Sequence, residues 1–403
     1  MAQTGNRQNN HSGKKKGKIR GRIIGIVGLA AAMLLGGAGG YAIAAWADAN
    51  SGGNGSFLDV LLIIIITVLY IYIAFFLQVA LHEAGHMICG LLTGYRFVSY
   101  RVGSFMWIRL DGKIRLKRFS LAGTGGQCLM GPPDMKDGKL PYVLYNLGGA
   151  LMNLIVSAVS ILLAYVLRGN WYLALFFGVM AAVGLWLAAV NGIPFKLAML
   201  NNDGRNILDI GRSGDEMYSF WVQMKENEQM ARGIRVKDMP EEWFDIPDEE
   251  GVKCAMTAAR RVTTVGRLMD EHKFVEAADL IDRLLETDSA LIGLHRYLLI
   301  PERIYCELLG ERRKEVLDQW KDKNLQKILK QMKNYPQILR VQYAYALIAE
   351  NDREKAEKIR RQFEKVVQSY PYPGDAQSER ELLEIAAAQL NCNPEIDTGN
   401  ELC

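Results

Sequence analysis

Histidine is scarce in this 403-residue sequence, which contains only five. Only two of them, His82 and His86, lie in the apolar part of the chain. Any metal binding or catalysis by histidine in that part therefore depends on this pair. The C-x-x-C motif is also absent, because no two of the six cysteines are spaced in this way. We therefore expect reduced thiols at all six positions, which are Cys89, Cys128, Cys254, Cys306, Cys392 and Cys403.

Polar residues are nearly absent from several long stretches in the first half of the chain. An α-helix needs about 20 apolar residues to cross a bilayer. Four stretches reach this length: 23–45, 57–81, 142–167 and 171–193. We predict a polytopic membrane protein with about four transmembrane helices. The last two stretches offer almost no polar side chains, which argues against a zinc transporter, because ion pathways need polar residues within the bilayer.

Lysine and arginine are distributed unevenly around these stretches. Residues 1–22 hold seven of them and no acid, and 94–141 holds nine against three acids. The 46–56 loop has none, and the 168–170 turn has only Arg168. Because cytoplasmic loops carry the excess of positive charge, we predict a multi-pass cell-membrane protein with both termini in the cytoplasm.

The N-terminal part combines a basic tail with the first apolar stretch. We interpret 1–22 as a cytoplasmic tail that fixes topology and contacts anionic lipid, and we expect no nucleic-acid partner. The 23–45 stretch is long for the apolar region of a signal peptide, and no clear cleavage site precedes the polar loop. We therefore expect an uncleaved transmembrane anchor.

A short segment between the second and third apolar stretches has a different pattern. Apolar and basic residues roughly alternate over 95–119, and Asp111-Gly112 interrupts the alternation as a hairpin turn does. We predict a small β-segment there, at the cytoplasmic membrane surface. A stretch rich in glycine and proline then leads to the third apolar stretch.

The chain after about residue 205 has the pattern of a soluble helical region. Ala277, Val316 and Ala356 occupy matching places, 39 and 40 residues apart, in three related helix openings. These openings are 271–286, 309–320 and 350–366. The spacing predicts stacked hairpins of the tetratricopeptide type, whose usual repeat is about 34 residues, with an irregular helical bundle as the alternative. We assign 211–403 to a cytoplasmic α-helical domain and the whole chain to the mainly α class.

The second apolar stretch leads into an H-E-x-x-H motif, His82-Glu83-Ala84-Gly85-His86. On a helix this spacing puts both histidines on one face, where they can bind one zinc ion with the glutamate beside it. Ionisable residues inside a membrane are costly and functional by default. We predict that His82 and His86 bind Zn²⁺. Glu83 then takes a proton from water whose pKa zinc lowers to about 7.

Depth and ligand number constrain the rest of this site. From Phe57 to His82 a helix is roughly 37 Å long, so the histidines reach the cytoplasmic edge of a hydrocarbon core of roughly 30 Å. Catalytic zinc usually has three protein ligands. No third histidine is available, and Asp203, just past the fourth apolar stretch, is the first candidate for the third ligand. Asp209 and Asp111 are the rivals, although Asp111 is better explained as a turn residue.

The third apolar stretch begins with small and amide-bearing residues on one helical face. Asn146, Gly149, Ala150 and Asn153 follow the i, i+3, i+4, i+7 spacing of such a face. Small residues allow helices to approach closely. Asn153 has two candidate roles, a catalytic hydrogen bond to a developing oxyanion or a bond between helices.

These motifs together resemble the site-2 protease family of intramembrane zinc metalloproteases. The family's first core helix carries H-E-x-x-H, its middle helix G-P-x-x-N, and its last helix N-x-x-P followed by an L-D-G-type sequence. In this chain Gly149–Asn153 matches the middle pattern with Ala150 in place of proline. Asn191–Pro194 matches N-x-x-P, and Asn202-Asp203-Gly204 stands where L-D-G is expected. The resemblance covers about 57–210, which we assign to the protease core.

The sequence departs from the family pattern in two places. The stretch from Pro194 to Asp203 is about four residues longer than usual, and Asn202 replaces leucine. The resemblance implies that the β-segment 95–119 pairs with an extended substrate strand. Relatives often carry PDZ or CBS domains, and here the helical tail takes their place.

We therefore expect a zinc-dependent endopeptidase that cuts transmembrane protein or peptide substrates near the cytoplasmic membrane face. The lipid bilayer is its second partner, and the helical tail has the kind of surface that binds a protein partner. The alternative is a non-catalytic membrane-anchored scaffold with a structural metal site. A purely structural metal site would not need Glu83 beside its two histidine ligands, which argues against this alternative.

Overall fold

The computed structural model describes residues 57–120, 124–194, 201–245, 255–286 and 293–389. The predicted tail 1–22 and anchor 23–45 lie outside these residues. The chain divides into two units, Met1–Ile71 and Tyr72–Cys403.

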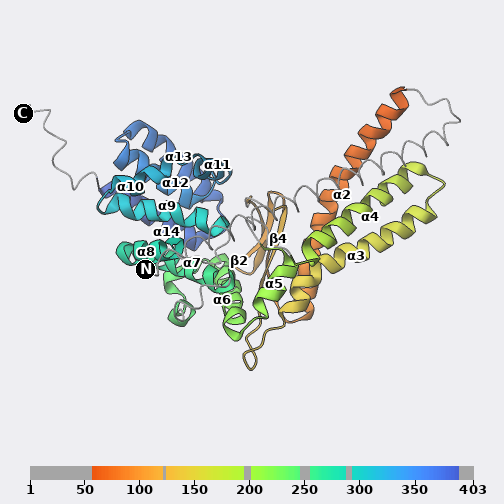
Figure 1. The fold of residues 1–403 in the computed structure, drawn as a ribbon, viewed down its shortest axis with the longest axis horizontal. Coiled ribbons are helices and arrows are strands. Elements are labelled where there is room, and N and C mark those ends of the chain that lie inside the picture. The colour runs from red at the N-terminus through yellow and green to blue at the C-terminus, as the bar shows by residue number, and fades with distance from the viewer. Residues whose placement is uncertain (1–56, 121–123, 195–200, 246–254, 287–292, 390–403) are drawn as a thin grey trace, which may run out of the picture. The chain divides into compact units, whose positions relative to one another are not determined.

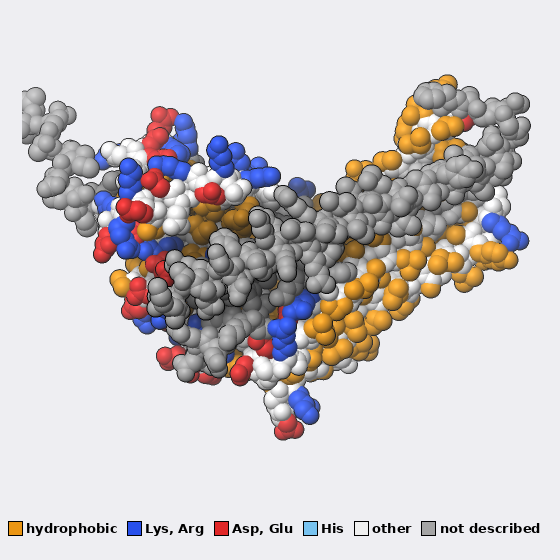
Figure 2. All heavy atoms as spheres, in the orientation of Figure 1, with side chains coloured by type: hydrophobic (Ala, Val, Ile, Leu, Met, Phe, Trp, Pro, Cys, Tyr) orange, Lys and Arg blue, Asp and Glu red, His pale blue; other side chains and the backbone are white. Residues whose placement is uncertain are grey.

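Three of the described helices are long and apolar enough to cross a membrane, namely α2 (Phe57–Leu92), α3 (Tyr142–Val166) and α4 (Trp171–Gly192). They correspond to the second, third and fourth apolar stretches of the sequence. Most of their leucine, isoleucine, valine and aromatic side chains are exposed, and Figure 2 shows these hydrophobic side chains covering α3 and α4. Apolar patches of this extent mark a surface that meets a membrane or another protein. The first unit contributes the beginning of α2, and the second contributes the part from Tyr72 onward.

Glycines bring α2 and α3 into close contact within the second unit. A Cβ added at Gly85 of α2 would lie 2.2 Å from the carbonyl oxygen of Gly148 in α3. A Cβ added at Gly148 would in turn lie 2.5 Å from the carbonyl oxygen of Gly85. Only glycine allows the two backbones to approach this closely. Helices α3 and α4 lie side by side (Figure 1).

A four-stranded antiparallel sheet follows α2, in the order β3-β2-β1-β4. Its strands are β1 (Arg96–Val102), β2 (Phe105–Leu110), β3 (Lys113–Arg118) and β4 (Gly126–Gly131). The first three strands confirm the predicted β-segment. Asp111 and Gly112 form the turn between β2 and β3 with φ of +50° and +75°, the left-handed backbone that such hairpin turns require.

The fourth strand comes from the glycine- and proline-rich stretch that the sequence pattern assigns to no element. Strand β4 pairs with β1 and forms one edge of the sheet. Arg101 of β1 is buried and helps to hold β4 in place, because its guanidinium donates to Thr124 Oγ1 at 2.5 Å and to the Gly126 carbonyl at 3.1 Å. The sheet therefore extends by one strand toward the motif on α2.

The remainder of the described chain is helical. The first helices after α4 are α5 (Asp203–Ile210) and α6 (Gly214–Ala231), and α6 lies against β4 (Figure 1). The larger helices that follow are α7 (Ala255–Asp270), α8 (Phe274–Glu286), α9 (Gly293–Leu309), α11 (Lys323–Gln331), α12 (Pro336–Ala344), α13 (Arg353–Ser369) and α14 (Pro373–Ala388). The apolar sides of these larger helices form one core of buried residues.

The three predicted helix openings share a local feature. His272, Arg312 and Asn351 have φ of 59°, 58° and 51°. Each stands two residues before a helix, namely α8, the short α10 (Lys314–Leu317) and α13. The middle opening continues as a 3₁₀ turn after α10 instead of a full helix. A helical region is therefore present, whereas the tetratricopeptide interpretation stays a prediction.

Candidate metal and catalytic site

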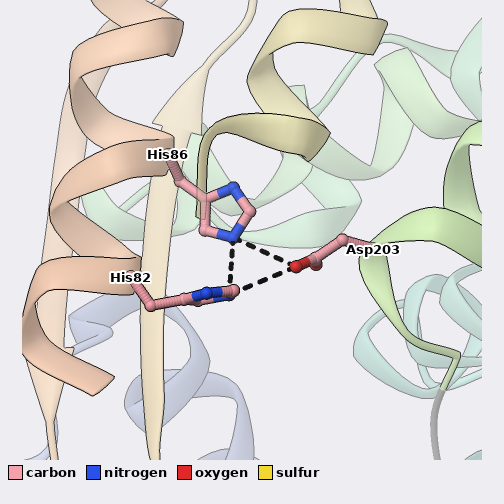
Figure 3. A group of neighbouring side chains, drawn as sticks. All are labelled: His82, His86 and Asp203. Atoms are coloured by element: carbon pink, nitrogen blue, oxygen red, sulfur yellow. Dashed lines mark hydrogen bonds and ion pairs between the residues drawn. The ribbon is translucent and has the colours of Figure 1, made fainter. Parts of the chain in front are cut away.

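Three side chains from two helices converge at one point of the second unit (Figure 3). His82 Nε2 lies 3.2 Å from His86 Nε2. Asp203 Oδ2 lies 3.2 Å from His82 Nε2 and 3.4 Å from His86 Nε2. Among the described residues, this is the one group of three or more His, Cys, Asp or Glu side chains with ligand atoms close enough to hold a metal ion.

The other nitrogen of each imidazole is held by a hydrogen bond to an acceptor on α3. His86 Nδ1 lies 2.8 Å from the backbone carbonyl oxygen of Tyr145, which can only accept, so Nδ1 carries the proton. His82 Nδ1 lies 2.6 Å from Asn153 Oδ1. The amide nitrogen of Asn153 donates to Gln78, which assigns Oδ1 as the acceptor on the other side. Metal-binding histidines are oriented in this way by a bond to their second nitrogen.

Protons on the Nδ1 atoms of both histidines leave room for a cation between the two Nε2 atoms and Asp203. With both protons on Nδ1, the lone pairs of the two Nε2 atoms face a carboxylate oxygen. Asp203 Oδ2 is buried and accepts no hydrogen bond. Three acceptor atoms in contact repel one another unless a cation lies between them. Two imidazole nitrogens and one carboxylate oxygen are also a common ligand set of catalytic zinc.

Asp203 is brought to the histidines by the start of α5. The preceding residue, Asn202, caps this helix by accepting from the Arg205 N–H at 2.9 Å. Its amide nitrogen donates to the carbonyls of Val190 and Ile193 at 2.6 and 2.5 Å, which ties α5 to the end of α4. The Asn202 that departs from the family's leucine therefore has a structural function. It anchors the residue next to it.

The residue after the aspartate, Gly204, lies where only glycine fits. A Cβ at Gly204 would lie 2.2 Å from the Gly192 carbonyl oxygen, so α5 approaches α4 at backbone distance.

The rival carboxylates lie elsewhere. Asp209 is paired with Arg205, whose Nη2 lies 2.6 Å from Asp209 Oδ1, and it accepts from Asn201 at 3.0 Å. Asp111 forms the hairpin turn between β2 and β3.

Glu83 faces the sheet. Its carboxylate lies against β4, because a Cβ added at Gly126 would lie 2.6 Å from Glu83 Oε1. Glu83, His82 and Asp203 line one cavity of about 500 Å³ together with Thr124 and the first part of β4. The two imidazoles, the acid and an edge strand therefore share one space.

Asn153 belongs to a hydrogen-bonded chain that crosses three helices. It is fully buried, and its amide nitrogen donates to the backbone oxygen and to Oε1 of Gln78 at 3.0 and 2.7 Å. Gln78 in turn donates to the Met180 carbonyl of α4 at 2.9 Å. The amide hydrogens of Asn153 are thus directed at Gln78 and not at the space between the imidazoles.

Gln78 and Tyr145 contact Asn153 and His86, and neither residue was predicted from the sequence. Gln78 lies one helical turn before His82 in an otherwise apolar helix. A polar residue at this spacing is a sequence pattern from which its place beside the histidines could have been predicted. The contribution of Tyr145 is a backbone carbonyl, which leaves no trace in the residue type.

Gly149 provides the space that the imidazoles occupy. A Cβ at this position would lie 2.4 Å from His82 Nε2 and 2.6 Å from His86 Nε2. The small-residue face of the third apolar stretch therefore lies directly beside the ligand atoms. The neighbouring Asn146 lines the same cavity.

The comparisons with known proteins agree with this geometry. The model of Peptidase family M50 matches residues 70–369, which is more than half of the chain and contains the histidines, Glu83 and Asp203. No curated protein and no solved structure matches the chain. The family resemblance inferred from the motifs is confirmed, and the chain belongs to peptidase family M50, the site-2 protease family of membrane-embedded metalloproteases.

Proposed function

We propose that this protein is a zinc-dependent endopeptidase that hydrolyses peptide bonds of transmembrane substrates near the cytoplasmic membrane face. The observation that carries the proposal is the convergence of His82 Nε2, His86 Nε2 and Asp203 Oδ2 within 3.4 Å of one another. Family membership supports the protease chemistry.

His82, His86 and Asp203 would hold the ion, and we assign it as Zn²⁺ from the ligand set. When bound, zinc supplies a Lewis acid that polarises a carbonyl and lowers the pKa of water. Asn153 then acts as a positioning residue for His82, in place of the oxyanion role considered from the sequence. The hydrogen bonds of its amide to Gln78 and its contact with His82 Nδ1 support this assignment.

Glu83 is the proposed general base. It is the remaining carboxylate beside the ligands in the cavity, and it is 8% exposed. A base must lie within hydrogen-bond reach of the proton that it removes. A water molecule in this cavity would lose a proton to Glu83 as it attacks the scissile carbonyl.

The edge of β4 is the proposed site for the substrate backbone. A transmembrane substrate must unwind locally, because helical carbonyls are already hydrogen-bonded. An unwound segment can add to an exposed sheet edge as a further strand. In support, β4 is a terminal strand of the sheet and its first residue touches Glu83. This strand lies just outside the 95–119 segment proposed from the sequence.

The proposed topology places the site within reach of cytoplasmic water. We retain the multi-pass arrangement with both termini in the cytoplasm, which rests on the distribution of lysine and arginine. The histidines lie in the last three turns of α2, and after three connecting residues the chain enters strand β1, which carries Arg96 and Arg101, in support of a position at the membrane edge.

The test replaces Glu83 by glutamine, which keeps the shape of the side chain and removes the base. Membranes of cells that express wild type or Glu83→Gln are compared by mass spectrometry of newly formed protein N-termini, beside the matched control Glu354→Gln on the exposed surface of α13. We expect termini within or next to transmembrane segments in wild type and in Glu354→Gln, and none with Glu83→Gln. Equal sets of termini in all samples would favour the scaffold alternative.

A further inference from the structure

A second cavity, of about 300 Å³, lies among α6, α7, α9, α12 and α14. Five of the side chains that line it are carboxylates, namely Glu226, Asp270, Glu302, Asp375 and Glu379. No lysine, arginine or histidine from the part of the chain that the structure describes lines the cavity. It is separate from the metal site, with which it shares no lining residue.

Arginines behind the cavity compensate only part of this charge. Arg340 is fully buried and donates to both Glu302 Oε1 and Glu379 Oε2, at 2.5 and 2.7 Å, so two acids share one base. Asp270 pairs with Arg235 at 2.5 Å. Five carboxyl groups therefore line the cavity, and these two arginines pair with three of them.

Two of the carboxylates have an oxygen without a partner. Glu226 is 4% exposed and its Oε1 makes no hydrogen bond. Glu302 is 7% exposed and its Oε2 makes none. Buried polar atoms are almost always hydrogen-bonded, so these two oxygens, one on α6 and one on α9, can each accept a further donor.

The other residues that line the cavity indicate which kind of hydrogen-bond donor fits there. Aliphatic side chains such as Leu298, Leu299 and Val265 line the cavity, and so do Tyr335 and Tyr370. The carboxylates are not clustered closely enough to hold a metal ion, since the one such cluster among the described residues is at His82. Apolar contacts suit an aliphatic stem, and tyrosine faces attract an organic cation.

The ionisation of the carboxylates agrees with a missing cation. Burial raises the pKa of Glu226 to about 8, with the hydroxyl of Thr263 and the charge of Arg260 opposing the rise. Burial also raises the pKa of Glu379, against the charge of Arg340. A positively charged ligand would restore the ionised forms that burial disfavours.

We propose that this cavity binds a lysine or arginine side chain from a basic peptide segment, which in the setting of the proposed protease is the cytoplasmic flank of a transmembrane substrate. The identity of that partner rests on the proposed function. Cytoplasmic segments next to transmembrane helices carry an excess of lysine and arginine. The cavity would thus select substrates by the charge beside their membrane span.

The test measures peptide binding to the full-length chain in detergent at low salt. The probe is a fluorescent capped peptide, Ser-Leu-Lys-Arg-Leu-Ser, and its matched control has glutamine in place of lysine and arginine. We compare wild type with Glu226→Gln, which removes a carboxylate that lines the cavity, and with Glu354→Gln, which removes an exposed carboxylate on α13. We expect at least tenfold weaker binding of the neutral peptide and of Glu226→Gln, about 1.4 kcal/mol, and no change in Glu354→Gln.

Four results would overturn the proposal. These are equal affinity for the two peptides, unchanged affinity in Glu226→Gln, no binding at about 1 mM basic peptide, and displacement of the peptide by calcium ions alone. A peptide of residues 13–22 of this chain serves as a competitor. If it binds at least tenfold more tightly than the probe, the occupant is the chain's own basic tail and the substrate assignment is wrong.

In this binding assay every protein, including the reference called wild type above, also carries Glu83→Gln, so that cleavage plays no part. If the basic peptide binds but no Glu83-dependent cleavage exists, the proposed function fails and the cation site stands. If Glu83-dependent cleavage exists but the peptide does not bind, the cation site alone fails. Circular dichroism of Glu226→Gln checks that the variant is folded.

Discussion

Replacing Gly149 by alanine adds one methyl group beside the metal site. The new Cβ would lie 2.4 Å from His82 Nε2 and 2.6 Å from His86 Nε2. Ordinary contacts begin at 3.4 Å, so the rings or α3 must retreat by about 1 Å. Zinc–nitrogen distances tolerate only about 0.2 Å of change. The substitution therefore displaces both imidazoles far beyond what the metal accepts.

The expected magnitudes follow from these distances. Loss of a residue that merely orients a ligand lowers metal affinity by about 10–100-fold. Gly149→Ala disturbs two ligands directly, so we expect a loss of at least about 100-fold. Overpacking of this kind costs about 1–3 kcal/mol of folding free energy. The protein should therefore still fold, but with an empty site.

The assay is zinc content per chain by elemental mass spectrometry, together with affinity from competition with a chelating dye. Two glycine-to-alanine variants serve as controls. Gly178→Ala in α4 meets nothing within 4 Å, so it should keep its zinc and its stability. Gly148→Ala contacts the Gly85 backbone and Cys89, so it should lose stability without touching an imidazole. Wild-type zinc affinity in folded Gly149→Ala would refute the reasoning.

Three further predictions concern the ligands, the metal and the helical region. Asn153→Ala should weaken zinc binding by about 10–100-fold because His82 loses its orienting acceptor, as measured by dye competition, with unchanged affinity as the contrary result. A chelator should abolish cleavage and added zinc should restore it, and activity that survives complete metal removal contradicts the mechanism. Hydrogen bonds from Arg313 and Arg303 outweigh burial and lower the pKa of Glu307 to about 2. Because this folded-state pKa is depressed, the stabilisation that the ionised carboxylate provides is present above about pH 4.5 and lost as the pH falls toward 2. Glu307→Gln should accordingly raise amide exchange in α9 at pH 7, and equal exchange in the two proteins would show that the ion pairs contribute nothing.

The sequence predicted the parts of the site that depend on local spacing. The i, i+4 spacing of His82 and His86 puts both rings on one face of α2, and no tertiary information is needed for that. Asp111-Gly112 marks the turn by its residue types, and the alternating pattern on either side marks two strands. The expectation that Asp203 meets the histidines came from the family pattern together with its place beyond α4, and the structure brings the three side chains together.

What the sequence did not predict depends on contacts between distant segments. Strand β4 has the sequence Gly-Gln-Cys-Leu-Met-Gly, which contains no β-branched residue, and it becomes a strand because β1 offers it a partner. The acceptor for His86 is the carbonyl of Tyr145, a group that every residue carries. Asn153 was placed on the correct face, but the direction of its amide depends on Gln78 from another helix.

The account depends on zinc held by two imidazoles and one carboxylate. X-ray absorption at the zinc edge of the purified full-length chain measures this coordination directly. We expect two nitrogen ligands at about 2.0–2.1 Å and oxygen at about 2.0–2.2 Å, with the oxygen contribution reduced in Asp203→Ala. A spectrum dominated by sulfur at about 2.3 Å, or one unchanged by Asp203→Ala, would contradict it.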